Sequence, residues 1–491
     1  MIMAKPTPIS LPIAPIGGLI AILLIALLSV TSPAWAGDKG PSRDLLISDI
    51  VLIDFAGDEV RRREGQSVLI HEGRIVAVEP SDRLSVPPAA ERIEGQGRTL
   101  VPGLTDMHVH IWDEAELGAY LASGVTTVRN MSGMPFLLEM RDRIASGELA
   151  GPTIVTTGPI LNSPGPNAQL NHQIVETAEE GRAAVRGQFE QGYRRIKVYS
   201  NLRRAAYEGI KKEAKSLGLT LTGHTPEGAR VEGIPEREPF AIAFTELLDD
   251  GFATIEHVES IVWHGLRNRH DKAEGRALAR RIAEAGVAVD PTLIAFANLA
   301  RVAETQGAHL AREGTETLNP FVRSMESAQS ERWSSEDASR ARDQLAFYID
   351  FTKMLAEEGV TLVTGSDAGI ATNIPGVSLH DEFDLLIDAG LTPAQVLRSA
   401  TADAAHVMGL ESEFATIDLG LRADLLLIDG DPTTEIELLR RPSLVIANGV
   451  IFNSERIETL RRSASLTDAD RTAANVLAAM AAQGTTVDLG D

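Results

Sequence analysis

The chain has 491 residues, which is enough for one large domain and a smaller one. It carries 46 Lys and Arg against 69 Asp and Glu, a formal net charge of −23, and this excess of negative charge argues against nucleic acid and anionic membranes as partners. It contains no cysteine, which excludes disulfides and a lipid-modified cysteine anchor.

The first 36 residues have the pattern of a secretory signal peptide. Lys5 precedes an apolar run over residues 16–28, and Ala34-Trp35-Ala36 supplies small residues at the two positions that determine cleavage. The run is short for a membrane span, which needs about 20 residues, so an uncleaved anchor is the weaker alternative. We therefore expect cleavage after Ala36, a periplasmic or secreted protein, and no stable membrane association afterwards.

Two stretches near the ends of the chain predict a β-rich domain. Residues 46–100 contain short runs rich in Val and Ile, broken by Gly-Asp and Glu-Gly, and a similar texture returns in residues 414–453. We expect residues 37–102 and 411–455 to form one composite β-sandwich. Residues 456–491 predict a polar helical tail with a frayed end.

Candidate strands alternate with helix-forming segments between these two stretches. Their number is eight, whereas an open doubly wound sheet usually has five or six strands, and no Gly-rich dinucleotide fingerprint follows any of them. We therefore predict an α/β protein with a closed (β/α)8 TIM barrel over residues 103–410. An excursion at about 294–350 contains more helix than one barrel step needs and is a candidate lid. The candidate strands are 104–110, 125–131, 152–158, 195–200, 219–225, 253–258, 287–294 and 360–369.

Potential metal ligands stand at corresponding ends of several predicted strands. His108 and His110 end the first strand and, being two residues apart, point the same way. Imidazoles and a carboxylate on the carboxyl-terminal rim of a barrel suit zinc or a similar divalent ion. A single histidine would be explained as structural, but coincidence would have to affect five strands. The full set is His108, His110, Lys197, His224, His257 and Asp367.

Lys197 is the unusual member of this set. It lies in the middle of a short predicted strand, and burying a lone ammonium group shifts its pKa by roughly 3–5 units, at about 1.4 kcal/mol per unit. Either the side chain reaches solvent, or a group at the site removes its charge.

Several motifs resemble the amidohydrolase superfamily, in particular its imidazolonepropionase-like and Xaa-Pro-dipeptidase-like branch. They are PGLTDMHVH, IKVYS, GHT, IEHV, TGSDAG and the segment that runs from LTPAQVLRSATADAAHVMGL to GLRADLLLID. The resemblance covers about residues 45–455 and implies a binuclear metal centre in a (β/α)8 barrel beside a composite β-sandwich. Asn130 departs from the pattern, since relatives often show Arg-Asp where this chain has Arg129-Asn130, and we assign it no role that needs a carboxylate.

The resemblance also implies how the ligands are shared between two divalent ions, which we expect to be zinc, with manganese and cobalt as alternatives. The lysine of the fourth strand is carboxylated by CO2, and its carbamate enters the site as an anion that bridges the ions. By this resemblance, the first ion is held by His108, His110 and Asp367, the second by His224 and His257, and the two are joined by the carbamate of Lys197.

The implied reaction is hydrolysis of a C–N bond in an amide, a peptide or a cyclic amide. Two divalent ions that share a water lower its pKa, and the hydroxide attacks the substrate carbonyl carbon. Asp367 then acts as general base and afterwards as general acid for the leaving nitrogen. We expect small N-acyl amino acids or dipeptides as substrates. The alternatives are a cyclic-amide hydrolase or deaminase on the same scaffold and, in another class, a non-catalytic metal-binding or assembly protein; a homo-oligomer is left open.

Three further residues are candidates for contact with the substrate. Tyr199 lies two positions beyond Lys197, so it points to the same side and nearer the rim, with simple packing as its alternative. His172 lies in the loop that leaves the third strand, and His380 follows the eighth strand. The remaining histidines predicted as surface or structural residues are His71, His264, His270, His309 and His406.

Overall fold

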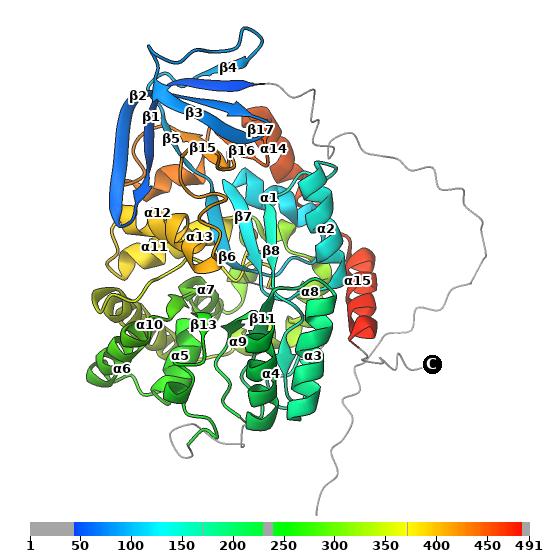
Figure 1. Cartoon of the computed structure of the whole chain (residues 1–491). Coiled ribbons are helices and arrows are strands. Elements are labelled where there is room, and N and C mark those ends of the chain that lie inside the picture. The colour runs from blue at the N-terminus through cyan, green and yellow to red at the C-terminus, as the bar shows by residue number, and fades with distance from the viewer. Residues whose placement is uncertain (1–43, 170, 229–238, 371, 484–491) are drawn as a thin grey trace, which may run out of the picture. The chain divides into compact units, whose positions relative to one another are not determined.

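The computed structural model describes residues 44–169, 171–228, 239–370 and 372–483 (Figure 1). The predicted signal peptide, its cleavage position and the last eight residues of the predicted tail lie outside the described residues. Within these described ranges, no helix combines the length and the apolar character that crossing a membrane requires.

Segments from both ends of the described chain build one eight-stranded sheet. Strand β1 pairs antiparallel with β2, which pairs with β3, and β1 also pairs in parallel with β4 and β5. The C-terminal strands join through β15, which pairs antiparallel with β5 and leads to β16 and β17. The strands are β1 (Leu45–Ala56), β2 (Glu59–His71), β3 (Arg74–Pro80), β4 (Glu91–Glu94), β5 (Thr99–Pro102), β15 (Leu425–Ile428), β16 (Leu444–Ala447) and β17 (Val450–Asn453).

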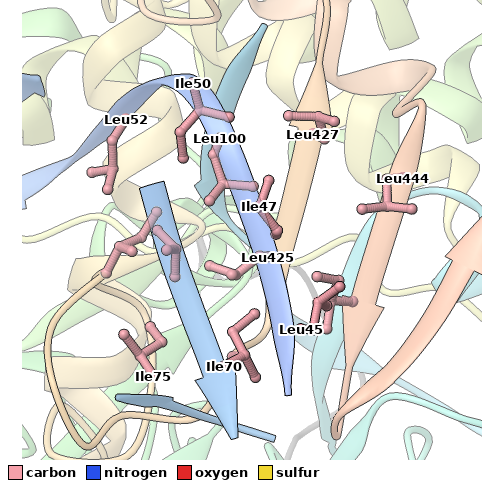
Figure 2. Close-up of a cluster of buried hydrophobic side chains, with 14 residues drawn as sticks. Leu45, Ile47, Ile50, Leu52, Ile70, Ile75, Leu100, Leu425, Leu427 and Leu444 are labelled. Atoms are coloured by element: carbon pink, nitrogen blue, oxygen red, sulfur yellow. The ribbon is translucent and has the colours of Figure 1, made fainter. Parts of the chain in front are cut away.

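One face of this sheet is apolar and forms a core. The register of β1 shifts between Ile47 and Ile50 and again between Ile50 and Leu52. The first shift is a bulge in β1, whose extra residue lets Ile47 and Ile50, three positions apart, share the buried side with Leu52. At the second shift the extra residue lies in β2. Figure 2 shows these three β1 side chains together with Leu100 and Leu425, which come from opposite ends of the chain. Burial of this shared core joins the two segments into the predicted composite β-sandwich domain.

Parallel strands alternating with helices form the (β/α)8 barrel. The predicted eighth strand, residues 360–369, forms isolated bridges through Leu362 to β14 and through Ala368 to β6. Between β8 and β11, the backbone N–H of Gly158 donates to the carbonyl of Arg195 at 2.9 Å. These contacts connect the parallel strands into a closed circle that begins and ends at β6. The predicted fold class is confirmed. The other strands are β6 (Leu104–Val109), β7 (Val125–Asn130), β8 (Thr153–Thr156), β9 (Leu161–Asn162), β10 (Gln173–Ile174), β11 (Arg195–Val198), β12 (Thr220–Gly223), β13 (Phe252–Glu256) and β14 (Ala288–Asp290).

The helices surround the barrel, and several of their ends carry standard capping residues. For example, α3 begins with a capping box between Thr177 and Glu180, and α6 ends at Gly286, whose φ is 68°. The helices are α1 (Leu117–Ala122), α2 (Pro135–Ser146), α3 (Ala178–Glu190), α4 (Arg204–Ser216), α5 (Val258–Gly265), α6 (Lys272–Ala285), α7 (Leu293–Glu304), α8 (Pro320–Met325), α9 (Ser327–Ser334), α10 (Ala338–Glu357), α11 (Val377–Asp388), α12 (Pro393–Ser399), α13 (Ala402–Met408), α14 (Ser454–Ser463) and α15 (Ala469–Ala482).

Two regions whose roles the sequence leaves open have defined positions. The excursion at 294–350 consists of most of α7, then α8 and α9, and the first part of α10, and α10 packs against α5, α6, α7 and α11. The tail contains two helices, and the second of them, α15, packs against α2 and α8 (red in Figure 1).

Candidate metal centre

The first strand, the fourth strand and the eighth strand bring four of the predicted ligands together. The amine Nζ of Lys197 lies 3.2 Å from Nε2 of His108. Oδ1 of Asp367 lies 3.1 Å from Nε2 of His110 and 3.5 Å from Nε2 of His108. Lys197 is 1% exposed, so its side chain does not reach solvent.

The fifth and sixth strands add the two remaining histidines. The ring centroid of His257 lies 4.6 Å from that of His108 and 4.5 Å from that of His224. One ligand atom from each of His108, His257 and Asp367 lies within 4.8 Å of the other two, which is close enough for one ion. All six residues predicted as ligands are therefore in one cluster.

Each of the four imidazoles is oriented by a hydrogen bond at its Nδ1 atom. Histidines that bind metals through one ring nitrogen almost always bond the other nitrogen in this way, because the bond sets the ring orientation and the tautomer. The arrangement leaves the Nε2 atoms for an ion. The four pairs are His108 with Glu256 Oε2 (2.9 Å), His110 with Ser132 Oγ (2.9 Å), His224 with Ser260 Oγ (3.1 Å) and His257 with Thr292 Oγ1 (2.6 Å).

Glu256 and Arg129 form a buried ion pair beneath His108, which the sequence analysis missed. Nη2 of Arg129 donates to both carboxylate oxygens, at 2.9 and 3.1 Å, and its Nε donates to the carbonyl of Met107 at 2.6 Å. Burial alone would raise the pKa of Glu256, but the guanidinium and the hydroxyls of two threonines hold it below its usual value. The ionised carboxylate therefore accepts a hydrogen bond from the Nδ1–H of His108. The one signal in the sequence was an acidic residue directly before a predicted ligand, in IEHV.

Burial sets the protonation of the rest of the cluster. It lowers the pKa of all four imidazoles, so they are neutral and can donate a lone pair. Burial also lowers the pKa of Lys197 to about 8. For Asp367 burial acts in the opposite direction, but the neighbouring His108 and His110 hold the pKa of this carboxyl well below its usual range. Neutral imidazoles and an ionised carboxylate are a donor set that fits a divalent ion such as zinc.

The rings of Tyr199 and His172 lie beside the cluster, with Tyr199 next to His224. The centroid of the Tyr199 ring lies 4.0 Å from that of His224 and 4.7 Å from that of His172. Nδ1 of His172 accepts from the backbone N–H of Gln169 (3.3 Å) and pairs with the amide Nδ2 of Asn162 (3.2 Å), which assigns the ring proton to Nε2. This Nε2 is buried and has no hydrogen-bond partner among the described residues. Burial lowers the pKa of His172 to about 3, so the ring is a neutral donor.

The structure corrects the expectation for His380 and explains Asn130. Nε2 of His380, which lies in the first turn of α11, donates to the carbonyl of Ser123 at 2.9 Å, next to the amino end of β7 and not at the carboxyl-terminal rim. His380 is therefore not part of the cluster. Oδ1 of Asn130 accepts from the N–H of Ile111 (2.9 Å), and its Nδ2 donates to Thr156 (3.1 Å), which a carboxylate could not do.

Residues 99–452 match the model of the amidohydrolase family. The chain belongs to this family. It is therefore a hydrolase that acts on carbon–nitrogen bonds, in a family that generally depends on metal ions, and the candidate metal centre lies where the predicted ligands converge.

Relatives of this amidohydrolase cover most of its length. An imidazolonepropionase from Geobacillus sp. (strain WCH70) is 24% identical over 405 residues, which are 76% of this chain and 85% of the relative. Among solved structures, a bottromycin amidohydrolase superposes with a TM-score of 0.69 at 24% identity, covering 90% of this chain and 96% of that one. A Xaa-Pro dipeptidase with bound methionine in its active site gives a TM-score of 0.62 at 21% identity, covering 84% and 100%. These structural similarities support the fold.

Proposed function

We propose that this amidohydrolase is an exported, binuclear metal-dependent enzyme that hydrolyses the amide bond of small N-acyl amino acids or dipeptides. The observation that carries the proposal is the position of Lys197, whose fully buried amine lies against His108 Nε2 inside a ring of neutral imidazoles. Burial of a lysine cation at this position destabilises the fold, whereas the carbamate form of the same side chain would be an anionic ligand for metal ions.

The chemistry of the buried amine supports carboxylation. Only a neutral amine adds CO2, in a step that forms an N–C bond and releases one proton, and a pKa lowered to about 8 makes this form accessible near neutral pH. The carbamate oxygens of Lys197 would join two zinc ions. By the family resemblance, one ion would be held by His108, His110 and Asp367, and the other by His224 and His257.

Divalent ions in such a site supply an activated water and polarise a carbonyl oxygen. The chain's own contribution to proton transfer is Asp367, which is ionised and lies 3.1 Å from His110 Nε2. In this proposal the carboxylate takes a proton from the nucleophile and passes it to the leaving nitrogen.

The substrate side is supported by His172 and Tyr199. The neutral Nε2–H donor of His172 has no hydrogen-bond partner among the described residues, and a substrate carbonyl or carboxylate oxygen would provide one. The Tyr199 ring lies between this donor and His224, so we place the substrate along that face.

Export is supported by the sequence of residues 1–36 alone. The alternative substrate class, a cyclic amide, is favoured by the similarity to an imidazolonepropionase over 405 residues. Either class of substrate would be hydrolysed at the candidate metal centre, so the products distinguish them: a free amine from a dipeptide or N-acyl amino acid, and a ring-opened product from a cyclic amide.

A hydrolysis screen tests the proposal. Metal-free protein is reloaded with zinc, manganese or cobalt, with and without bicarbonate, and is assayed on dipeptides, N-acyl amino acids and cyclic amides. We expect release of a free amine from dipeptides or N-acyl amino acids, stimulated by bicarbonate. Ring opening without dipeptide cleavage would favour the alternative. Bound metal with no turnover of any substrate would overturn the assignment as an enzyme of this class.

A further inference from the structure

The C-terminal helix α15 reaches the loop that follows the two histidines of the first strand. Nη2 of Arg471 donates to both carboxylate oxygens of Asp113, at 2.6 and 2.7 Å, and its Nε donates at 3.0 Å. The backbone N–H of Asp468 donates to the same carboxylate at 3.1 Å. Asp113 is 0% exposed and lies three residues after His110. The guanidinium that pairs with it belongs to Arg471, in the tail.

A second set of buried contacts connects the tail, the excursion and the same loop. Nδ2 of Asn319, just before α8, donates to Oγ1 of Thr472 at 2.8 Å and to Oε1 of Glu116 at 3.3 Å. The other oxygen of Glu116 accepts from the backbone N–H of Trp112 at 3.1 Å. Residues 111–116 are therefore held to α15 at two points.

The opposite side of this loop is bonded to the segment that carries Asp367. The indole N–H of Trp112 donates to the carbonyl of Gly369 at 2.8 Å, and the backbone N–H of His110 donates to the carbonyl of Ala368 at 2.7 Å. The loop thus connects the tail with two residues of the candidate metal centre. The tail helices begin after residue 452, where the match to the family model ends.

We propose that Arg471 is a positioning residue for the metal centre, which it serves by fixing Asp113 and, through the loop, His110. The inference rests on the proposed metal-dependent function. Without the guanidinium, Asp113 would be a buried carboxylate lacking its counter-charge, and the loop would have to move to hydrate it. Movement of the loop would displace the backbone of His110, whose N–H donates to Ala368, and with it the ring that Ser132 orients.

The test compares Arg471→Met in the full chain with a matched control, Arg61→Met. Arg61 also lies 2.6 Å from an aspartate that is 0% exposed, Asp54, but in the β-sheet domain. Three quantities are measured: the zinc dissociation constant by chelator competition, the melting temperature, and hydrogen exchange of residues 110–117 in the metal-free protein. Arg471→Met should raise the zinc dissociation constant about tenfold, the lower end of the range for loss of a direct partner of a metal ligand, because Arg471 acts on His110 only through Asp113 and the loop. It should also accelerate exchange in 110–117. Arg61→Met should lower the melting temperature but leave both other quantities within twofold of wild type.

Asp113→Asn is the second variant, because it removes the ion pair without leaving a buried charge, and it should change zinc affinity in the same direction. Zinc binding at the wild-type level in Arg471→Met and Asp113→Asn would overturn the positioning role while leaving the proposed function intact. Equal weakening by Arg61→Met would also overturn it, because the effect would then be general instability. A wild-type protein that binds no zinc would overturn both proposals.

Discussion

Replacing Lys197 with methionine should stabilise the metal-free protein and abolish hydrolysis. Burial lowers the pKa of this amine from 10.5 to about 8, and each unit corresponds to about 1.4 kcal/mol. Below pH 8 both states are protonated, but the unfolded chain holds the proton more tightly, so folding carries a penalty of about 3 kcal/mol at pH 7. Methionine has a similar length and no charge, and it should remove that penalty.

The sign of the pH dependence follows from the same values. Between pH 8 and 10.5 the unfolded chain binds more protons than the folded chain, so the stability of the wild type rises with pH in this window and the advantage of Lys197→Met shrinks. At pH 10 we expect it to be about 1 kcal/mol.

The assay is urea unfolding of chelator-treated, CO2-free protein at pH 7 and pH 10, together with kcat/KM after reloading with zinc. The variant should lose at least about 10³-fold in kcat/KM, because the metal contributes several kcal/mol of charge stabilisation. A variant that is less stable than wild type at pH 7, or whose stability difference is equal at both pH values, would show that Lys197 is not a buried cation in this cluster.

Three other predictions concern the surroundings of the centre. Glu256→Gln should weaken zinc binding by about 10–100-fold in a chelator competition, because it replaces the anionic acceptor of His108 Nδ1 by a neutral amide with one acceptor oxygen for both Arg129 and His108. The control, Glu213→Gln, changes a nine-tenths buried carboxylate that pairs with a surface arginine and should leave zinc binding unchanged. His172→Phe should raise KM about fivefold with little change in kcat, since a neutral donor to the substrate contributes about 1 kcal/mol. Exposed His406→Phe is its control, and a kcat effect would contradict the substrate role. Chelation should abolish activity, and zinc plus bicarbonate should restore more than zinc alone.

Much of the candidate site was predictable because it depends on local periodicity. His108 and His110 share a direction through the two-residue repeat of a strand, and parallel barrel strands place their carboxyl ends on one rim. The same reasoning was wrong for His380, because the position of a residue beyond the end of a strand does not follow from the strand's two-residue repeat. It also missed Glu256, whose partner on another strand is 148 residues away.

The sequence by itself determined the order of strands and helices and the set of residues that could bind metal, including the unusual lysine among them. Each of these features follows from a pattern of residues that are close together in the chain. Tertiary structure alone decided which buried groups neutralise one another. Asp113 and Arg471 are 358 residues apart, and each would be an ordinary surface charge in isolation. In the folded chain Asp113 is 0% exposed and its cationic partner is Arg471 of α15. A buried charge needs a counter-charge, and the fold brings that partner beside it.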